Sequence, residues 1–327
     1  MVMLLRAPAL AALGATTGLP NRQPIRPSLG VNRRPLFRGF CPPIETAKEV
    51  VCDAAVGESG ISIGQPGVLA PADTYKKIVE LGEMKGKLSP MKTFIMAIVA
   101  GVFISFGALL ALSVGFSCPG MVESNPGAQK ILLGLFGLPF GLFLVINCGV
   151  ELFTGNTAFL TASVLEGKSS VAQLGKSWFF SYFGNLAGCL LTVWTINACG
   201  LSATADPAMA VATAKTSLTF MQAFLRGILA NWLVCIGAWM AYASSSMPGK
   251  VLGIFLPISS FVAMGFEHSV ANMFFIPFGI NFGAAGLTFA SFCTTNLIPV
   301  TLGNIVGGAF CLATLSSLFY GKLGENI

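Results

Sequence analysis

Four ionisable side chains stand within or beside long apolar stretches of this 327-residue sequence: Glu151, Arg226, Glu267 and His268. Such groups are costly at membrane depth, so each is a candidate for a functional site. His268 is the only histidine of the chain. A neutral imidazole donates one hydrogen bond and accepts another, and its charge changes near physiological pH. In a narrow apolar pore it could meet a small anion; a buried histidine satisfied by Glu267 or a carbonyl group is an equal alternative.

The two glutamates stand where an apolar stretch is interrupted by polar residues. Backbone N–H groups lose their helical partners at such a break. A carboxylate that accepts those N–H bonds would hold the break open. We favour this structural role for Glu151 and Glu267 over a role in lining a pore. Arg226 either neutralises one of them or extends towards the membrane surface.

The composition is that of a membrane protein. Hydrophobic residues make up 54% of the chain, charged residues 10%, and the mean hydropathy is +0.77. This argues against a water-soluble enzyme, a disulfide-stapled secreted domain and a nucleic-acid-binding module. The nine cysteines form no C-x-x-C pair, so we expect no metal site and no cofactor.

Six spans fit between residues 91 and 322, because one span needs roughly 20 apolar residues. We expect an all-α membrane domain in which the second and fifth helices are interrupted at Glu151 and Glu267. Five lysines between residues 76 and 92 precede the first span, which places both termini on one lysine-rich side. The expected spans cover about residues 93–116, 131–150, 174–199, 218–242, 251–266 and 297–320.

Three motifs occur twice, in the same order. The first begins Thr-Phe at residues 93 and 219, the second contains the glutamates, and the third is Gly-Asn-x-x-Gly at residues 184 and 303. A unit of three spans is odd, so the second copy must enter the membrane from the opposite side. This predicts an inverted 3+3 repeat whose broken helices meet near the midplane around a solute path. A chance match of small-residue motifs is the alternative.

The N-terminal residues differ from the rest in composition. Residues 1–44 contain six arginines and no acidic residue, which is typical of an organelle transit peptide and here favours a plastid. A basic disordered tail is the alternative. Residues 45–90 would form a stromal tail. Within it, residues 72–88 place Tyr75, Ile78 and Val79 on one face, as in an amphipathic helix at the membrane surface.

Three segments resemble the signatures of the formate/nitrite transporter family: residues 149–156, 265–273 and 296–304. The resemblance extends over about residues 72–322. Together with the predicted transit peptide over residues 1–44, this resemblance indicates the plastid members of green algae that carry bicarbonate or nitrite. It implies an aquaporin-like fold of six spans, a homopentamer and one pore in each protomer.

The resemblance also implies roles for individual residues. His268 is the central pore histidine and Thr154 its partner on the opposite break. Leu152 and Phe153 form one hydrophobic constriction, and Phe261 forms the other.

Two further residues match the family. Asn272 is the asparagine four residues after the histidine, and Lys215 is the lysine that draws anions to the mouth of the pore. The histidine often found just before the second Thr-Phe pair is missing here, which puts proton delivery from that side in doubt. Arg226 receives no role from the family.

We therefore expect a channel or transporter for small monovalent anions in a chloroplast membrane, with the inner envelope favoured. Bicarbonate ranks first, nitrite second, and formate is a permeant analogue. A water or neutral-solute channel should carry paired Asn-Pro-Ala motifs, whereas this chain has one Asn-Pro-Gly at residues 125–127. A membrane enzyme using His268 lacks a second catalytic carboxylate placed for it. Channel and proton-coupled carrier stay open alternatives.

Overall fold

The computed structural model describes residues 67–201 and 203–325, and every regular element in this part of the chain is helical. The transit peptide predicted over residues 1–44 lies outside the described residues, as does most of the expected tail. Five helical segments are long and apolar enough to cross a membrane. They agree with five of the six expected spans. The remaining one, the fifth, corresponds to a shorter apolar helix, Met247–Ala263.

Three spans are single helices with polar N-caps: α2 (Pro90–Ser113), α7 (Val171–Ala198) and α9 (Phe220–Ala243). Their caps are Ser89, Ser170 and Thr219, whose side-chain oxygens accept first-turn N–H groups and so fix where each helix begins. The last span, Phe289–Tyr320, is a continuous segment in which α12 (Phe289–Phe292), α13 (Ile298–Ile305) and α14 (Leu315–Tyr320) alternate with π-helical turns.

Both predicted interruptions are present. The second span consists of α4 (Pro126–Leu135) and α5 (Leu138–Asn147), and it resumes after residues 148–152 as α6 (Phe153–Leu165). The fifth consists of α10 (Met247–Ala263) and resumes after residues 264–268 as α11 (Ser269–Asn281). Gly149 and Gly265 open the two breaks with φ of 67° and 73°, a conformation that favours glycine. The inverted orientation of the repeat stays a prediction.

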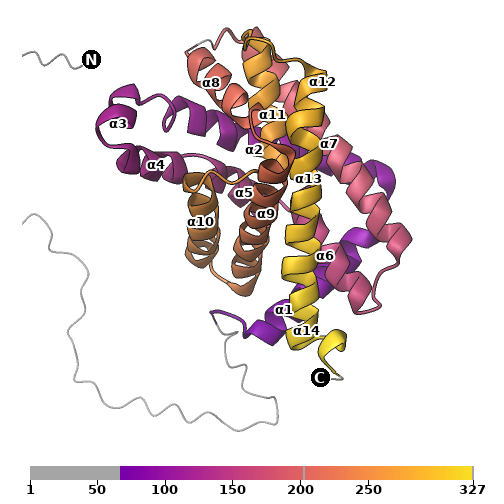
Figure 1. Ribbon diagram of the computed structural model, residues 1–327. Coiled ribbons are helices and arrows are strands. Elements are labelled where there is room, and N and C mark those ends of the chain that lie inside the picture. The colour runs from indigo at the N-terminus through magenta and orange to yellow at the C-terminus, as the bar shows by residue number, and fades with distance from the viewer. Residues whose placement is uncertain (1–66, 202, 326–327) are drawn as a thin grey trace, which may run out of the picture. The chain divides into compact units, whose positions relative to one another are not determined.

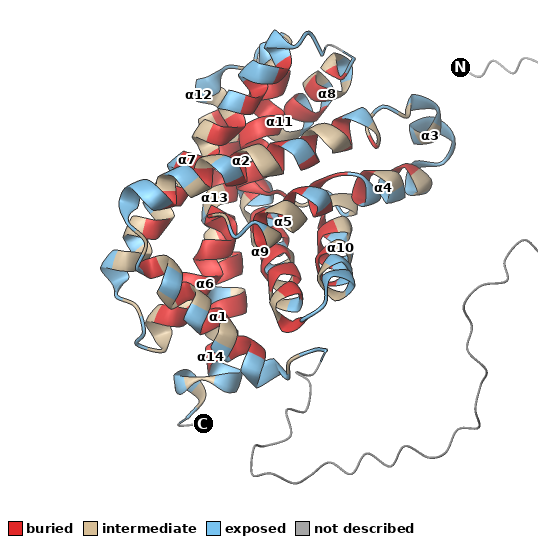
Figure 2. Ribbon diagram, turned by 180° about the vertical axis from the view of Figure 1, so that it is seen from behind, coloured by how far each residue is buried: buried red, intermediate tan, exposed pale blue. Residues whose placement is uncertain are grey.

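Small residues bring the spans into close contact. Gly101 of α2 lies against the backbone of Asn185 on α7, and Gly303 of α13 lies against the backbone of Phe224 on α9. Helices in membranes approach closely where such residues lack bulk. The half-helices α6 and α11 are buried along most of their length in the centre, as Figure 2 shows, while large apolar side chains face outward from the surrounding spans.

The amphipathic helix is α1 (Pro71–Gly86), close to the predicted range. Tyr75, Ile78 and Val79 are buried, as the pattern predicted, but against protein. Gly82 lies against the backbone of Phe159 on α6, so α1 packs on that half-helix. The expectation that its apolar face rests on the membrane surface is therefore wrong. Figure 1 shows α1 beside α14 at one end of the bundle and α8 (Ala205–Thr216) at the other.

Candidate functional site

The two breaks meet through His268 and Thr154. His268 is the N-cap of α11, and its Nδ1 accepts the backbone N–H of Ala271 at 3.0 Å. Its Nε2 lies 2.9 Å from Thr154 Oγ1 in the first turn of α6. Because Nδ1 is an acceptor in this arrangement, the proton of the neutral ring sits on Nε2, which donates to Thr154. The cap thus fixes both the tautomer and the direction of the only imidazole.

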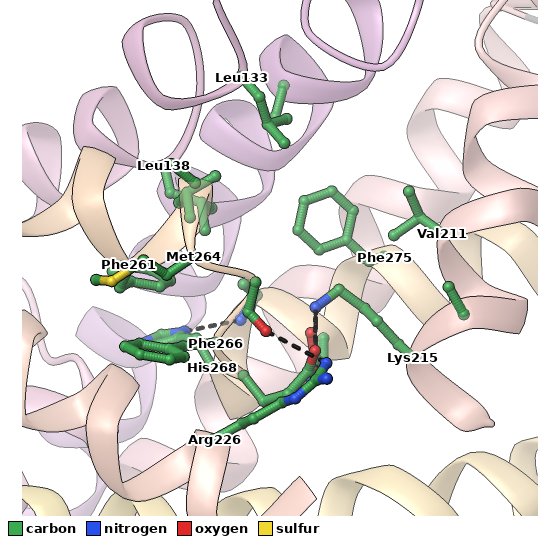
Figure 3. Close-up of a pocket in the computed structure, with 18 of the residues that line it drawn as sticks. Leu133, Leu138, Val211, Lys215, Arg226, Phe261, Met264, Phe266, His268 and Phe275 are labelled. Carbon is green, nitrogen blue, oxygen red and sulfur yellow. Dashed lines mark hydrogen bonds and ion pairs between the residues drawn. The ribbon is translucent and has the colours of Figure 1, made fainter. Parts of the chain in front are cut away.

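A cavity of about 320 Å³ leads to His268 from the α8 end of the bundle. Figure 3 shows Lys215, Arg226, Phe261 and His268 among its lining side chains. Lys130 also lines it. Three cationic residues and Glu267 line this vestibule, which gives it an excess of positive charge that would concentrate anions near His268.

Two smaller cavities continue beyond the vestibule. The first is lined by Phe261, His268 and Leu152, and the second by Leu152, Lys85 and Asn156 among others. Phe261 is thus shared by the vestibule and the first small cavity, and Leu152 by the two small cavities. Both side chains are almost completely buried. This placement between neighbouring cavities is what constrictions on either side of His268 would require, and their role as constrictions stays a prediction.

Phe153 does not belong to this path. It lines none of the three cavities, and its ring packs edge-on against Tyr182 at 4.9 Å and Trp178 at 6.3 Å between ring centroids. These contacts do not support the expectation that Phe153 forms a constriction with Leu152, which stays a prediction. Phe153 is the first residue of α6, whereas Leu152 is the extended residue that caps it, so the two side chains leave the backbone in different directions.

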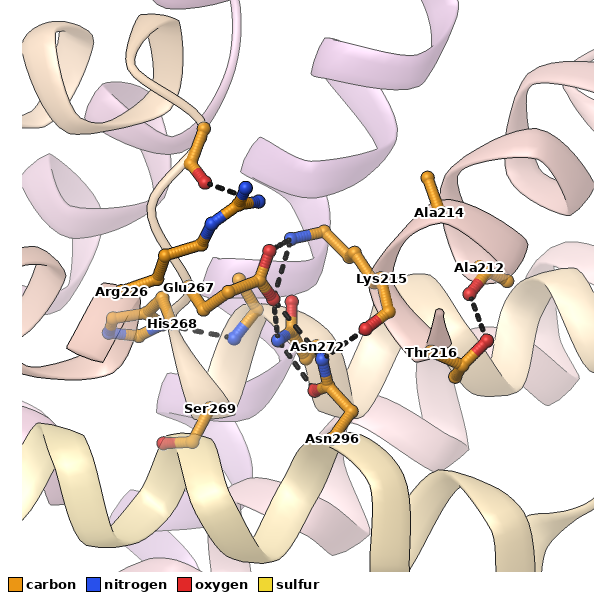
Figure 4. A network of polar contacts seen from close by, with 12 residues as sticks. Ala212, Ala214, Lys215, Thr216, Arg226, Glu267, His268, Ser269, Asn272 and Asn296 are labelled. Atoms are coloured by element: carbon orange, nitrogen blue, oxygen red, sulfur yellow. Dashed lines mark hydrogen bonds and ion pairs between the residues drawn. The ribbon is translucent and has the colours of Figure 1, made fainter. Parts of the chain in front are cut away.

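Glu267 is the centre of a polar network at the vestibule (Figure 4). Lys215 Nζ lies 3.0 Å from Oε1 and 3.1 Å from Oε2 of Glu267. Asn272 Nδ2 donates to Oε2 at 2.7 Å, and Asn296 Nδ2 donates to the same oxygen at 3.2 Å. The carboxylate is buried, so these donors supply the contacts that water would make at a surface.

Glu151 has a matching network towards the α1 end. Lys85 Nζ of α1 lies 2.6 Å from Oε1, and Asn156 Nδ2 donates to Oε2 at 2.8 Å. Sequence analysis missed both partners of Glu151. The signal was available for Asn156, because an asparagine follows each glutamate by five positions, at Asn156 and Asn272.

The first N–H groups of the two half-helices are accepted by asparagines rather than by the carboxylates. Asn185 Oδ1 accepts from Phe153 N at 2.9 Å, and Asn304 Oδ1 accepts from Ser269 N at 2.8 Å. Their Nδ2 groups donate to the carbonyls of Glu151 and Glu267 at 2.9 and 3.0 Å. The expectation that the carboxylates of Glu151 and Glu267 accept these backbone N–H groups is therefore wrong. Both asparagines belong to the repeated Gly-Asn-x-x-Gly motif, and this repetition was the sequence signal for a shared role.

A sequence-family model described as formate/nitrite transporter matches residues 72–318. The chain belongs to the formate/nitrite transporter family. A probable formate transporter of Methanothermobacter thermautotrophicus is 42% identical over 273 residues, which is 77% of this chain and 97% of that protein. The formate channel FocA of Escherichia coli K12 is 37% identical over 79% of this chain and 96% of its own length.

Solved structures of the formate/nitrite transporter family have the same fold. A pentameric formate channel with formate bound has a TM-score of 0.63 at 36% identity, covering 71% of this chain and 98% of that one. Another family ion channel has a TM-score of 0.67 at 30% identity, covering 76% and 99%. Together with the apolar helices, this makes the chain an integral multi-pass membrane protein of the family.

Within this family fold, Arg226 and Lys215 differ in their bonding. Lys215 is ion-paired to Glu267 and only 17% exposed at its side chain, and its role in drawing anions to the mouth of the pore stays a prediction. Arg226 is exposed, and its Nη1 lies 3.5 Å from the carbonyl oxygen of Gly265. Each buried glutamate is paired with a lysine, so Arg226 neutralises neither. Both cations nevertheless line the vestibule.

Proposed function

We propose that this chain is a channel for small monovalent anions and that His268 is the central hydrogen-bond donor on its path. The observation that carries the proposal is the Nε2–H of His268, which donates to Thr154 Oγ1 between two buried apolar side chains, Phe261 and Leu152. A passing anion would take the place of Thr154 as the acceptor of this N–H. Hydrophobic constrictions exclude strongly hydrated ions, whereas a donor between them favours a small anion. The names of the formate-channel relatives support the same class of solute.

We infer that bicarbonate is the principal anion, with nitrite second and formate as a permeant analogue. The ranking is supported by the resemblance to plastid members and by the arginine-rich leader. It also places the protein in a chloroplast membrane, with the inner envelope favoured. The reaction is transport without covalent chemistry, so no enzymatic role is proposed for His268.

The expected inverted repeat is supported by the two matched networks. Glu151 with Asn156, and Glu267 with Asn272, each receive a lysine, and each half-helix receives an asparagine acceptor. A homopentamer with one path in each protomer is supported by the solved formate channel, described as pentameric. Lipid would contact the apolar side chains that the assembly leaves uncovered.

Uptake by liposomes that contain the purified protein tests the proposal. Labelled bicarbonate, nitrite and formate should each enter faster than into protein-free liposomes, and bicarbonate should enter fastest. Uptake equal to that of protein-free liposomes for all three anions would overturn the channel. A faster entry of a neutral solute such as glycerol would favour the water or neutral-solute alternative. Recovery of the protein from chloroplasts with Met1 still attached would contradict the transit peptide predicted over residues 1–44.

A further inference from the structure

The vestibule contains the only arginine that follows Arg38 in the chain. Arg226 lies in the second turn of α9, is exposed, and lines the cavity that leads to His268 (Figure 3). All twelve lysines also follow Arg38, so this part of the chain uses a guanidinium group at a single place. A guanidinium group differs from an ammonium group because its planar fork of N–H donors can bind two oxygens of one anion at once.

Arg226 is attached at two points to the break that carries His268 (Figure 4). Its backbone carbonyl accepts the N–H of Glu267 at 3.3 Å, and its Nη1 donates to the carbonyl oxygen of Gly265 at 3.5 Å. These contacts hold the guanidinium group beside the residues that immediately precede His268. Within the described part of the chain, the Gly265 carbonyl is the only acceptor that this group contacts, so most of its N–H donors remain available at the cavity.

Arg226 has no carboxylate partner among the residues that the structure describes. Glu267 lines the same cavity, but both of its oxygens are already held by Lys215, and one of them also accepts from two asparagine side chains. The nearest acidic group is thus committed to another cation. The anion that would satisfy the guanidinium group therefore has to arrive through the cavity.

We propose that Arg226 is the entry site of the path, where its guanidinium group binds two oxygens of one anion before that anion passes Phe261 and reaches His268. This inference rests on the proposed function. Formate, nitrite and bicarbonate each present two oxygens on one central atom, which the guanidinium fork matches, whereas chloride has no such pair. Arg226 is thus a specificity-determining residue for small oxyanions, distinct from the central donor His268.

A charge in the vestibule without a fork is the contrasting case, and Lys130 provides it. Lys130 is also exposed, lines the same cavity and has no carboxylate partner among the described residues. An ammonium group attracts chloride and formate alike, because it acts as a point charge. Lys130→Gln therefore measures what the loss of one cationic charge does, and Arg226→Lys measures what the loss of the fork does at constant charge.

Chemical modification of the wild-type protein tests occupancy of the entry site directly. Phenylglyoxal modifies arginine, and Arg226 is its only arginine target after Arg38, so mass spectrometry can follow this residue in the full chain. Formate at roughly ten times its Kd should slow the modification of Arg226 about tenfold, whereas chloride at the same concentration should not slow it. The arginines of residues 6–38 report any general effect of formate on the reagent. Equal protection by the two anions, or protection of all arginines alike, would overturn the inference.

Transport by variants tests whether the entry site matters for flux. In liposomes at about 0.15 M salt, where distant charges are screened, Arg226→Lys should raise the half-saturating concentration for formate about tenfold. Lys130→Gln should raise it no more than about twofold, because it removes only a screened charge. A wild-type value in Arg226→Lys would overturn the inference. Formate uptake without protection of Arg226 would also overturn it but leave the channel intact, whereas absence of uptake for every anion would overturn the proposed function.

Discussion

His268 Nε2 and Thr154 Oγ1 lie 2.9 Å apart although 114 positions separate them in the chain. One belongs to the break before α11 and the other to the first turn of α6. This bond joins the two interrupted spans where His268 lines both the vestibule and the next cavity. The same histidine caps α11 through Nδ1, so one ring performs a structural task and presents a donor.

The two tasks of His268 should separate by substitution. Serine is a good N-cap and alanine is not, so His268→Ser should be more stable than His268→Ala by about 1 kcal/mol. Both variants lose the imidazole donor. We expect uptake of formate relative to neutral formamide to fall about tenfold in both. Thermal unfolding in detergent and liposome uptake measure the two effects, and an unchanged formate preference would contradict the role of the ring.

Leu152 and Phe153 should respond differently to truncation. Leu152→Ala opens a narrow point, so larger carboxylates such as acetate should enter faster than through the wild type. Phe153→Ala leaves a cavity beside Tyr182 and Trp178, and should cost about 3 kcal/mol of stability without changing the size limit. Uptake of anions of graded size checks this. A raised size limit in Phe153→Ala alone would reverse the assignment.

Asn185 and Asn304 should be essential for the two breaks. Replacement of either by leucine leaves a buried N–H and buried carbonyl groups without partners, at a cost of about 2–4 kcal/mol. Aspartate at either position keeps the acceptor for the half-helix N–H but loses the donor. We therefore expect the aspartate variants to assemble better than the leucine variants, measured as the yield of oligomer on size-exclusion chromatography. Equal yields would show that the accepted N–H bond is unimportant.

Glu166 holds α1 and the C-terminal segment together. It accepts hydrogen bonds from Tyr75 at 2.7 Å and Ser317 at 2.6 Å, and from the backbone N–H of Lys322 at 3.2 Å. Partial burial alone would raise the pKa of Glu166, but these hydrogen bonds outweigh it and hold the pKa below the ordinary value of 4.5. A carboxyl with a lowered pKa stabilises the folded state above its ordinary pKa, and this contribution is lost as the pH falls through the lowered value.

The attachment of α1 should therefore weaken in acid. We expect proteolysis of the segment before α2 to increase in the wild type as the pH falls below 4.5, the ordinary pKa of the carboxyl group. Glu166→Gln should remove this pH dependence, and Tyr75→Phe should weaken the attachment by about 1 kcal/mol near neutral pH. Limited proteolysis across a pH series gives the comparison. An identical acid response in Glu166→Gln would assign the effect to another group.

The sequence predicted the spans and both breaks because apolar runs and polar interruptions are local features. The resemblance to the family also assigned His268, Thr154 and Leu152 to one pore. Contacts between elements that are far apart in the chain were not predicted. The pairing of Lys85 with Glu151 was not predicted, because nothing local shows that α1 folds back on α6. The contacts of Phe153 with Tyr182 and Trp178 were not predicted either, because they depend on how α6 emerges from the break.

The most direct measurement is the uptake of labelled bicarbonate by liposomes containing Leu152→Trp, compared with wild-type protein and protein-free liposomes. Tryptophan at this narrow point fills the space next to His268, so uptake should fall to the protein-free level while the oligomer stays intact. Uptake equal to that of the wild type would show that anions do not pass between Leu152 and Phe261, and would contradict the account.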